Sequence, residues 1–291
     1  MTTTAQTSPS RLRLPEGREL AWSEWGTPDG WPVMFFHGGA DSRLEGALLH
    51  EAALHAGVRL IAPDRPGFGA SDPMPDRRFV DWPDDVHTLA EHLRLSSFSV
   101  VGHSGGGPHA LAVAADPRDR VRSVVVVAGA APRPASGRGM GLPFRLNRRF
   151  AISVPWLQTK LLTSHRDDVY DDPERFLSQW GRLSAPEGRL FEEHPEVGKA
   201  VVAQMREGYR QGIAAARHEG QLYYRDWGFE LEAIEVPVHL VYGSKDAQAP
   251  VRWGTYLQER IPGARLTVVE GEAHFSVLVR QAAAIVAAAC P

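Results

Sequence analysis

Short apolar runs alternate with longer amphipathic segments along most of this chain. The runs are rich in Val, Ile and Phe and have the length of buried strands. We therefore expect strands at residues 32–36, 58–62, 98–101, 121–128, 236–242 and 265–269. The segments between them predict helices at residues 44–54, 82–95, 108–115, 252–260 and 276–289. Strands that alternate with helices indicate right-handed crossovers and a mostly parallel sheet covered on both faces.

The first two strands differ from the others. Residues 11–14 and 18–25 are separated by the turn signal Pro15-Glu16-Gly17, which predicts an antiparallel hairpin at one edge of the sheet. With this hairpin, the expected fold is an α/β protein whose mostly parallel, eight-stranded sheet is flanked by helices. Ser42 and Glu45 have the spacing of a capping box, so we expect the first long helix to begin there.

The alternation of strands and helices stops between residues 130 and 227. This stretch is rich in Arg, Pro and Gly at its start and is then helical, without a clear strand. It follows the sixth expected strand, and we interpret it as a helical cap over the carboxyl-terminal edge of the sheet. The α/β core would then comprise residues 11–129 and 228–291, after a polar and disordered tail at residues 1–10.

The segment Gly102-His103-Ser104-Gly105-Gly106 joins an expected strand to an expected helix. A serine on such a sharp turn projects its hydroxyl above the sheet, and side chains at the flanking glycine positions of the motif would clash with the neighbouring backbone. The backbone N–H of Gly105 then faces the place where negative charge develops on a substrate oxygen. We therefore expect Ser104 to be a nucleophile and Gly105 an oxyanion donor. The turn lacks the Gly-Lys-Ser/Thr ending of a phosphate-binding loop, which excludes that alternative.

A serine nucleophile needs a base, and the base needs an acid that orients it. His274 follows the last expected strand and is the only histidine after Asp246, the candidate for the acid, so we expect His274 to be the base. Asp246 follows the strand at 236–242 and is the preferred acid. Asp226, near the end of the expected cap, is a weaker candidate. The sixth strand is followed by Gly129 and offers no carboxylate.

Composition and charge narrow the range of partners. A formal net charge of −3 over 291 residues gives no reason to expect nucleic acid or an anionic membrane. The chain has no apolar run of about 18 residues and no secretory signal pattern, so we expect a cytoplasmic protein without a membrane span. The single cysteine, Cys290, cannot form an internal disulfide. His50 and His55 do not have the spacing of a zinc-binding His-Glu-x-x-His helix, and no metal site is expected.

With these residues identified, the sequence resembles the α/β-hydrolase fold family, in the cap-bearing branch of epoxide hydrolases, dehalogenases and esterases. The motifs that carry the resemblance are His37-Gly38-Gly39, the segment from Asp64 to Asp72, the turn around Ser104, Gly243-Ser-Lys-Asp246 and Ala273-His274-Phe275. The resemblance implies that Gly39 supplies a second oxyanion N–H and that Asp64 and Arg65 shape a turn without a catalytic role. Epoxide hydrolases and haloalkane dehalogenases carry an aspartate nucleophile, so Ser104 argues against both activities.

Hydrolysis of a small carboxylic ester or a related acyl compound, through an acyl-enzyme, is the first functional expectation. The same triad would serve a C–C bond (diketone) hydrolase, a lactonase or an acyltransferase, and proton abstraction by the His–Asp pair is a further alternative. The third hypothesis is a non-catalytic ligand-binding protein on this scaffold. The expected partner is a small-molecule substrate, no cofactor is expected, and the oligomeric state stays open. Phe144, Trp156, Trp180 and Tyr209 are candidates for lining the pocket.

Overall fold

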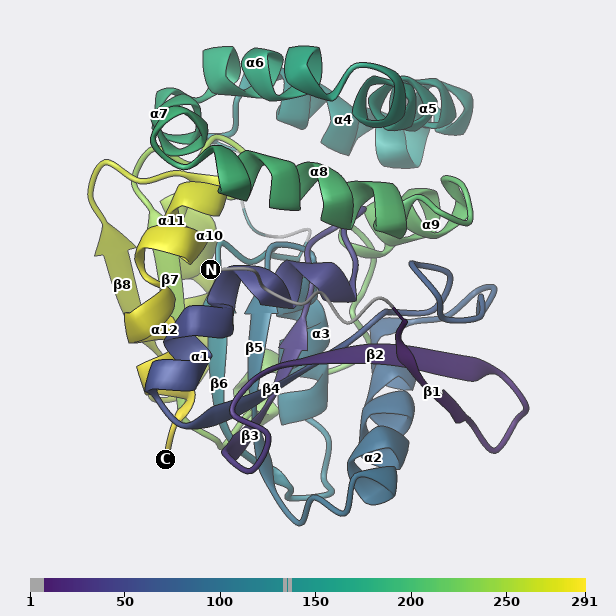
Figure 1. The fold of residues 1–291 in the computed structure, drawn as a ribbon, viewed down its shortest axis with the longest axis vertical. Coiled ribbons are helices and arrows are strands. Elements are labelled where there is room, and N and C mark those ends of the chain that lie inside the picture. Colours follow the sequence, from purple (N-terminus) through teal and green to yellow (C-terminus); the bar gives the residue numbers. More distant parts are fainter. Residues whose placement is uncertain (1–7, 133–134, 136–137) are drawn as a thin grey trace.

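The computed structural model describes residues 8–132, 135 and 138–291. In this part of the chain, eight strands form one sheet in the order β1-β2-β4-β3-β5-β6-β7-β8 (Figure 1). The strands are β1 (Ser10–Arg13), β2 (Glu19–Gly26), β3 (Trp31–Phe36), β4 (Val58–Pro63), β5 (Phe98–His103), β6 (Val121–Val127), β7 (Val238–Gly243) and β8 (Arg265–Val269). β2 pairs antiparallel with β1 and β4, and the other neighbouring pairs are parallel. The expected α/β fold, with its mostly parallel sheet and edge hairpin, is confirmed.

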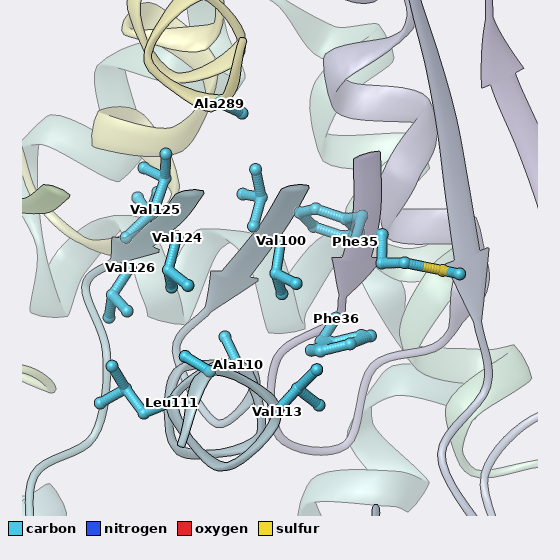
Figure 2. Packing of buried hydrophobic residues seen from close by; sticks show 14 of the residues in the cluster. Phe35, Phe36, Val100, Ala110, Leu111, Val113, Val124, Val125, Val126 and Ala289 are labelled. Atoms are coloured by element: carbon cyan, nitrogen blue, oxygen red, sulfur yellow. The ribbon is translucent and has the colours of Figure 1, made fainter. Parts of the chain in front are cut away.

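Helices cover both faces of this sheet. They are the 3-10 helix η1 (Arg43–Leu49), α1 (His50–His55), η2 (Phe79–Asp81), α2 (Trp82–His92), α3 (Gly106–Ala114), η3 (Leu231–Ala233), α10 (Val251–Arg260), α11 (His274–Arg280) and α12 (Ala282–Ala289). Figure 2 shows Val124 and Val126 of β6 pointing toward Leu111 of α3, while Ala289 of α12 lies on the opposite face. The near-continuous valine content of β6 therefore reflects burial on both faces, as parallel central strands require.

Six further α-helices lie between β6 and β7 in the described residues of this stretch. They are α4 (Leu142–Ser153), α5 (Pro155–Asp171), α6 (Pro173–Leu183), α7 (Ala185–Glu193), α8 (Pro195–Gly208) and α9 (Ala214–Leu222). α5, α6, α7 and α8 each carry a proline in the first turn, where the ring fits the helix and its missing N–H is not needed. Figure 1 shows this group, which we call the cap, above one end of the sheet. That residues 130–227 behave as a separate domain stays a prediction.

Three expectations about element boundaries are wrong or only partly testable. Residues 1–7 of the predicted tail at residues 1–10 lie outside the described residues. Ser10, the last residue of that tail, is instead part of β1 and pairs with Trp22 of β2. The predicted helix at 276–289 is two helices, because α11 packs on β7 and the cap helix α7 while α12 packs on β5 and β6. The helix after β3 begins as the 3-10 helix η1, and the side-chain oxygen of Ser42 accepts from the N–H of Leu44.

The order of the strands creates a crevice near the middle of the sheet. After β3 the chain moves to β4 on one side, and it then returns to β5 on the other side of β3. Loops that leave the carboxyl ends of two such strands diverge, and ligands bind at this point in open α/β sheets. The segment His37-Gly38-Gly39 follows β3 and Ser104 follows β5, so both candidate segments lie at the crevice.

Candidate active site

Ser104 stands on a tight turn between β5 and α3. Its φ of +50° lies in the left-handed region, which is strained for a residue with a side chain. Its N–H donates to the carbonyl of Val127 at 2.9 Å, which ties the turn to β6. A Cβ on Gly106 would lie 2.0 Å from the carbonyl oxygen of Phe36, and one on Gly102 would lie 2.5 Å from that of Gly106. Glycine is therefore required at both positions for the turn to close.

The structure brings the predicted nucleophile, base and acid into one hydrogen-bonded chain. His274 Nε2 lies 2.8 Å from Ser104 Oγ, and His274 Nδ1 lies 2.7 Å from Asp246 Oδ2. The other oxygen of Asp246 accepts from the N–H groups of Gln248 and Ala249 at 2.7 and 2.9 Å, so the carboxylate is fixed on both sides. Burial alone would lower the pKa of His274, but the Asp246 carboxylate raises it above its ordinary value.

Asp226, the weaker candidate for the acid, has a different role in the structure. Its carboxylate accepts from the N–H of Gly228 at 2.9 Å, a contact within the turn that leads from the cap to η3. Asp226 is exposed, whereas Asp246 and His274 are both buried. The geometry therefore assigns the contact with His274 to Asp246.

The two glycines predicted as oxyanion donors lie close together beside Ser104. The N–H groups of Gly39 and Gly105 have no hydrogen-bond partner in the described part of the chain. The nitrogen of Gly39 lies 3.0 Å from the place that a Cβ on Gly105 would take. Arg65 donates to the carbonyl oxygens of His37 and Gly38, and this holds the loop that carries Gly39.

Glu45 and His103 form a buried pair behind this site that the sequence did not reveal. His103 Nδ1 lies 2.7 Å from Glu45 Oε1, and the other oxygen of Glu45 accepts from the N–H of Gly38 at 2.7 Å. The second ring nitrogen of His103 lies 3.3 Å from the carbonyl oxygen of His274. The predicted capping box is therefore wrong, because Glu45 connects the Gly39 loop to the Ser104 turn instead of capping its own helix.

A buried ion cluster attaches the cap to the core. Glu219 of α9 accepts two hydrogen bonds from Arg65, of 2.7 and 2.8 Å, and one of 2.7 Å from Arg77. Burial alone would raise the pKa of Glu219, but the two guanidinium groups hold it well below its ordinary value. The hydroxyl of Tyr223 also donates to Glu219, at 2.8 Å. The four-residue spacing of Glu219 and Tyr223 on a helix could have predicted their contact, although nothing local identifies Arg65 and Arg77 as partners.

A second cap carboxylate reaches the segment that carries His274. Glu187 of α7 accepts from the backbone N–H groups of Phe275 and Ser276, at 2.8 and 3.1 Å. These residues open helix α11, where unpaired N–H groups favour a negative charge. Burial nevertheless outweighs the effect of these N–H groups and raises the pKa of Glu187 to about 7.

Ser104, His274, Gly39 and Gly105 open onto a cavity of about 370 Å³ between the cap and the sheet. Its other walls are mainly apolar and aromatic, with Met140, Phe144, Leu161, Leu162, Tyr209, Tyr223, Tyr224 and Trp253 among them. No Asp, Glu, Lys or Arg is among the lining residues that the structure describes. Burial lowers the pKa of His165, which also lines the cavity, to about 4, so its ring is neutral.

Two of the four residues predicted as candidates for the pocket line this cavity. Phe144 and Tyr209 are in its wall. Trp156 instead has 70% of its surface exposed, and Trp180 packs against Phe176 and Phe275. None of the described helices is long and apolar enough to cross a membrane. The described residues also contain no group of three or more His, Cys, Asp or Glu side chains arranged to hold a metal ion.

Comparison with known proteins identifies relatives of this chain. A family model described as the alpha/beta hydrolase fold matches residues 32–281. A non-heme chloroperoxidase of Kitasatospora aureofaciens is 29% identical over 273 residues, 91% of each chain. A bifunctional esterase/perhydrolase of Acinetobacter calcoaceticus is 29% identical over 247 residues, 81% of each chain. A pimeloyl-[acyl-carrier protein] methyl ester esterase of Neisseria meningitidis is 32% identical over 228 residues, 73% of this chain and 74% of the relative.

Solved structures share the same fold. A hydrolase from Pseudomonas aeruginosa superposes with a TM-score of 0.70 at 20% identity, covering 97% of each chain. A thermophilic esterase from Thermogutta terrifontis superposes with a TM-score of 0.68 at 22% identity, covering 97% of this chain and 96% of that one. The agreement over nearly the whole length includes the helices between β6 and β7.

Proposed function

This chain belongs to the α/β-hydrolase family and is a serine hydrolase, and we propose on that basis that it cleaves small, uncharged carboxylic esters through an acyl-enzyme on Ser104. The observation that carries the proposal is the continuous chain from Asp246 through His274 to Ser104, which ends in the cavity beside the N–H groups of Gly39 and Gly105. Each part of that arrangement corresponds to one step of acyl transfer.

In the first half of the reaction, Ser104 Oγ forms a bond to the ester carbonyl carbon while His274 Nε2 takes the hydroxyl proton. The negative charge moves to the carbonyl oxygen, where the N–H groups of Gly39 and Gly105 stabilise it. Asp246 keeps the proton of His274 on Nδ1 and stabilises the imidazolium that forms. The C–O bond to the alcohol then breaks, and His274 returns its proton to the departing oxygen.

In the second half, water attacks the acyl-enzyme carbonyl while His274 again takes the proton. The tetrahedral intermediate collapses, Ser104 leaves as the alcohol with the proton from His274, and the carboxylic acid departs. The described residues that line the cavity are largely apolar and include no Asp, Glu, Lys or Arg, which supports an uncharged acyl group, because an ionised substituent would lose its hydration without gaining a counter-charge from them.

The relatives favour perhydrolysis as a second candidate activity of the same site. Two relatives that each share 29% identity with the chain are named for peroxidase or perhydrolase activity. Hydrogen peroxide can replace water in the second half, since its oxygen attacks the acyl carbonyl and its proton passes to His274. The products are then a peroxy acid and free Ser104, with no change in the first half.

The direct test is turnover of a series of phenyl esters, from acetate to octanoate, with and without Ser104. We expect Ser104→Ala to lower kcat at least about 10³-fold for every substrate, because the covalent route is lost. Ser178→Ala, which removes an exposed hydroxyl from cap helix α6, is the matched control and should keep wild-type kcat. Turnover by Ser104→Ala at the wild-type rate would contradict the proposal.

A further inference from the structure

Gly105 occupies the position between the serine and the last glycine that the Gly-x-Ser-x-Gly motif leaves free. In this chain the free space is taken by Tyr223. A Cβ on Gly105 would lie 2.0 Å from Tyr223 Oη and 2.9 Å from its Cζ. A Cβ on Gly39 would lie 3.2 Å from the same hydroxyl oxygen. The phenol oxygen therefore lies against both residues whose N–H groups would hold the substrate carbonyl.

Tyr223 is held firmly in this position. It follows the last residue of α9, its N–H donates to the carbonyl of Glu219 at 3.1 Å, and its hydroxyl donates to the carboxylate of Glu219 at 2.8 Å. Its ring stacks on Phe79, with 6.2 Å between the ring centroids and 22° between the planes. Glu219 is itself fixed by Arg65 and Arg77. Two guanidinium groups of the core thus set the position of a cap hydroxyl at the reaction centre.

The charge of the cluster determines what this hydroxyl can offer a substrate. Arg65 and Arg77 keep Glu219 ionised, so its carboxylate can only accept hydrogen bonds. Burial and the charge of Glu219 raise the pKa of the Tyr223 phenol well above its ordinary value, so the phenol keeps its one hydrogen and gives it to Glu219. A phenol oxygen whose hydrogen is engaged has lone pairs left and acts as an acceptor.

We propose that Tyr223 Oη accepts a hydrogen bond from the substrate, and that the preferred acyl groups carry a hydroxyl or an N–H on the carbon next to the scissile carbonyl. This proposal rests on the ester hydrolysis by Ser104 proposed above. Gly39 and Gly105 present two donors to the carbonyl oxygen, and Tyr223 presents one acceptor beside them. A 2-hydroxyacyl or 2-acylamino ester carries the complementary pair, an acceptor with a donor one carbon away.

The test compares phenyl 2-hydroxybutanoate with phenyl butanoate in the wild type and in Tyr223→Phe. The hydroxyl of the substrate changes the intrinsic reactivity of the ester. The measured quantity is therefore the ratio of the kcat/KM values of the two esters, compared between the wild type and Tyr223→Phe. We expect the preference for the hydroxy ester to fall about 3- to 10-fold in Tyr223→Phe, since one hydrogen bond is lost. Tyr170→Phe removes a half-exposed cap hydroxyl that donates to the backbone carbonyl oxygen of Arg206, and it should leave the ratio unchanged.

Three other outcomes would overturn the inference, and each has a different meaning. An unchanged ratio in Tyr223→Phe would show that the hydroxyl does not contact the substrate. An equal loss on both esters would show that the phenol turns its hydrogen toward the oxyanion and is a donor instead. Turnover of both esters that survives Ser104→Ala would instead remove the proposed function on which the inference rests.

A second comparison uses only the wild-type protein and so does not depend on the variant folding. Phenyl 2-methoxybutanoate has an oxygen at the same carbon but no hydrogen to donate. We expect the wild type to prefer the 2-hydroxy ester over the 2-methoxy ester by about 3- to 10-fold after correction for their rates of alkaline hydrolysis. Equal corrected rates would contradict an acceptor at Tyr223.

Discussion

Glu187, on cap helix α7, accepts a hydrogen bond of 2.8 Å from the backbone N–H of Phe275. Phe275 directly follows His274, so a carboxylate of the cap holds the segment that positions the proposed base. Glu187 is fully buried, and its second oxygen accepts from the next N–H along the chain. The cap is therefore attached to the segment that carries His274 as well as lying over the cavity.

The first prediction concerns the pH dependence of stability through Glu187. Burial raises the pKa of Glu187 to about 7, above the value of about 4.5 in the unfolded chain. A carboxyl group with a raised pKa contributes stability that is full below pH 4.5 and is lost as the pH rises through 7. We expect the melting temperature of the wild type to fall between pH 5 and 8 relative to Glu187→Gln. The difference corresponds to at most about 3 kcal/mol.

Thermal unfolding at several pH values measures this difference. Glu193→Gln is the matched control, since Glu193 lies on the same helix but is exposed and pairs with Arg280. Its melting curve should follow the wild type across the range. Parallel pH profiles for wild type and Glu187→Gln would contradict the raised pKa of Glu187.

The second prediction concerns the pH dependence of catalysis through His274. The reaction needs a neutral ring, and Asp246 raises the pKa of His274 against the opposing effect of burial. We expect kcat/KM to rise with pH to a midpoint above about 6.5, the ordinary histidine value. Asp246→Asn should lower kcat roughly 10³- to 10⁴-fold and move the midpoint to lower pH, because the raising charge is removed. A midpoint that stays in place in Asp246→Asn would show that another group controls the profile.

The third prediction concerns the ion cluster between cap and core. Glu219→Gln leaves the guanidinium groups of Arg65 and Arg77 buried with one counter-charge fewer. Breaking a buried pair from one side typically costs about 3–5 kcal/mol, and we expect a loss of this size in urea unfolding. Glu232→Gln, which breaks an exposed pair with Arg260, is the control and should unfold at nearly the wild-type urea concentration. Equal midpoints for the two variants would show that the cluster does not stabilise the fold.

Local patterns were sufficient to predict most of the core. The valine-rich run of β6 and the strands beside it are continuous apolar segments, and such segments indicate strands covered on both faces. The break between α11 and α12 was not predictable in the same way. Residues 276–289 have an unbroken helical pattern, and they divide at Gln281 only because the two halves pack on different strands.

The residues of the site also differ in whether a local sequence pattern could predict them. Ser104, His274 and Asp246 each follow a recognisable strand, so their sequence context predicts a meeting at one edge of the sheet. Glu45 was assigned to a capping box because its spacing from Ser42 fits one, and nothing local shows that it turns to Gly38 and His103 instead. The contact of Tyr223 with Gly105 joins residues more than a hundred positions apart, and it depends on how the cap sits on the core.

Covalent labelling by an alkyl fluorophosphonate tests directly whether Ser104 is the nucleophile. The oxygen of an activated serine bonds to the phosphorus of such a reagent while fluoride leaves, so intact mass and peptide mapping locate the phosphonyl group that stays on the protein. We predict one phosphonyl group per chain, on Ser104, with activity lost in step with labelling and no adduct on Ser104→Ala. Full activity after exposure to the reagent, or a stoichiometric adduct on a different residue, would show that Ser104 is not the nucleophile.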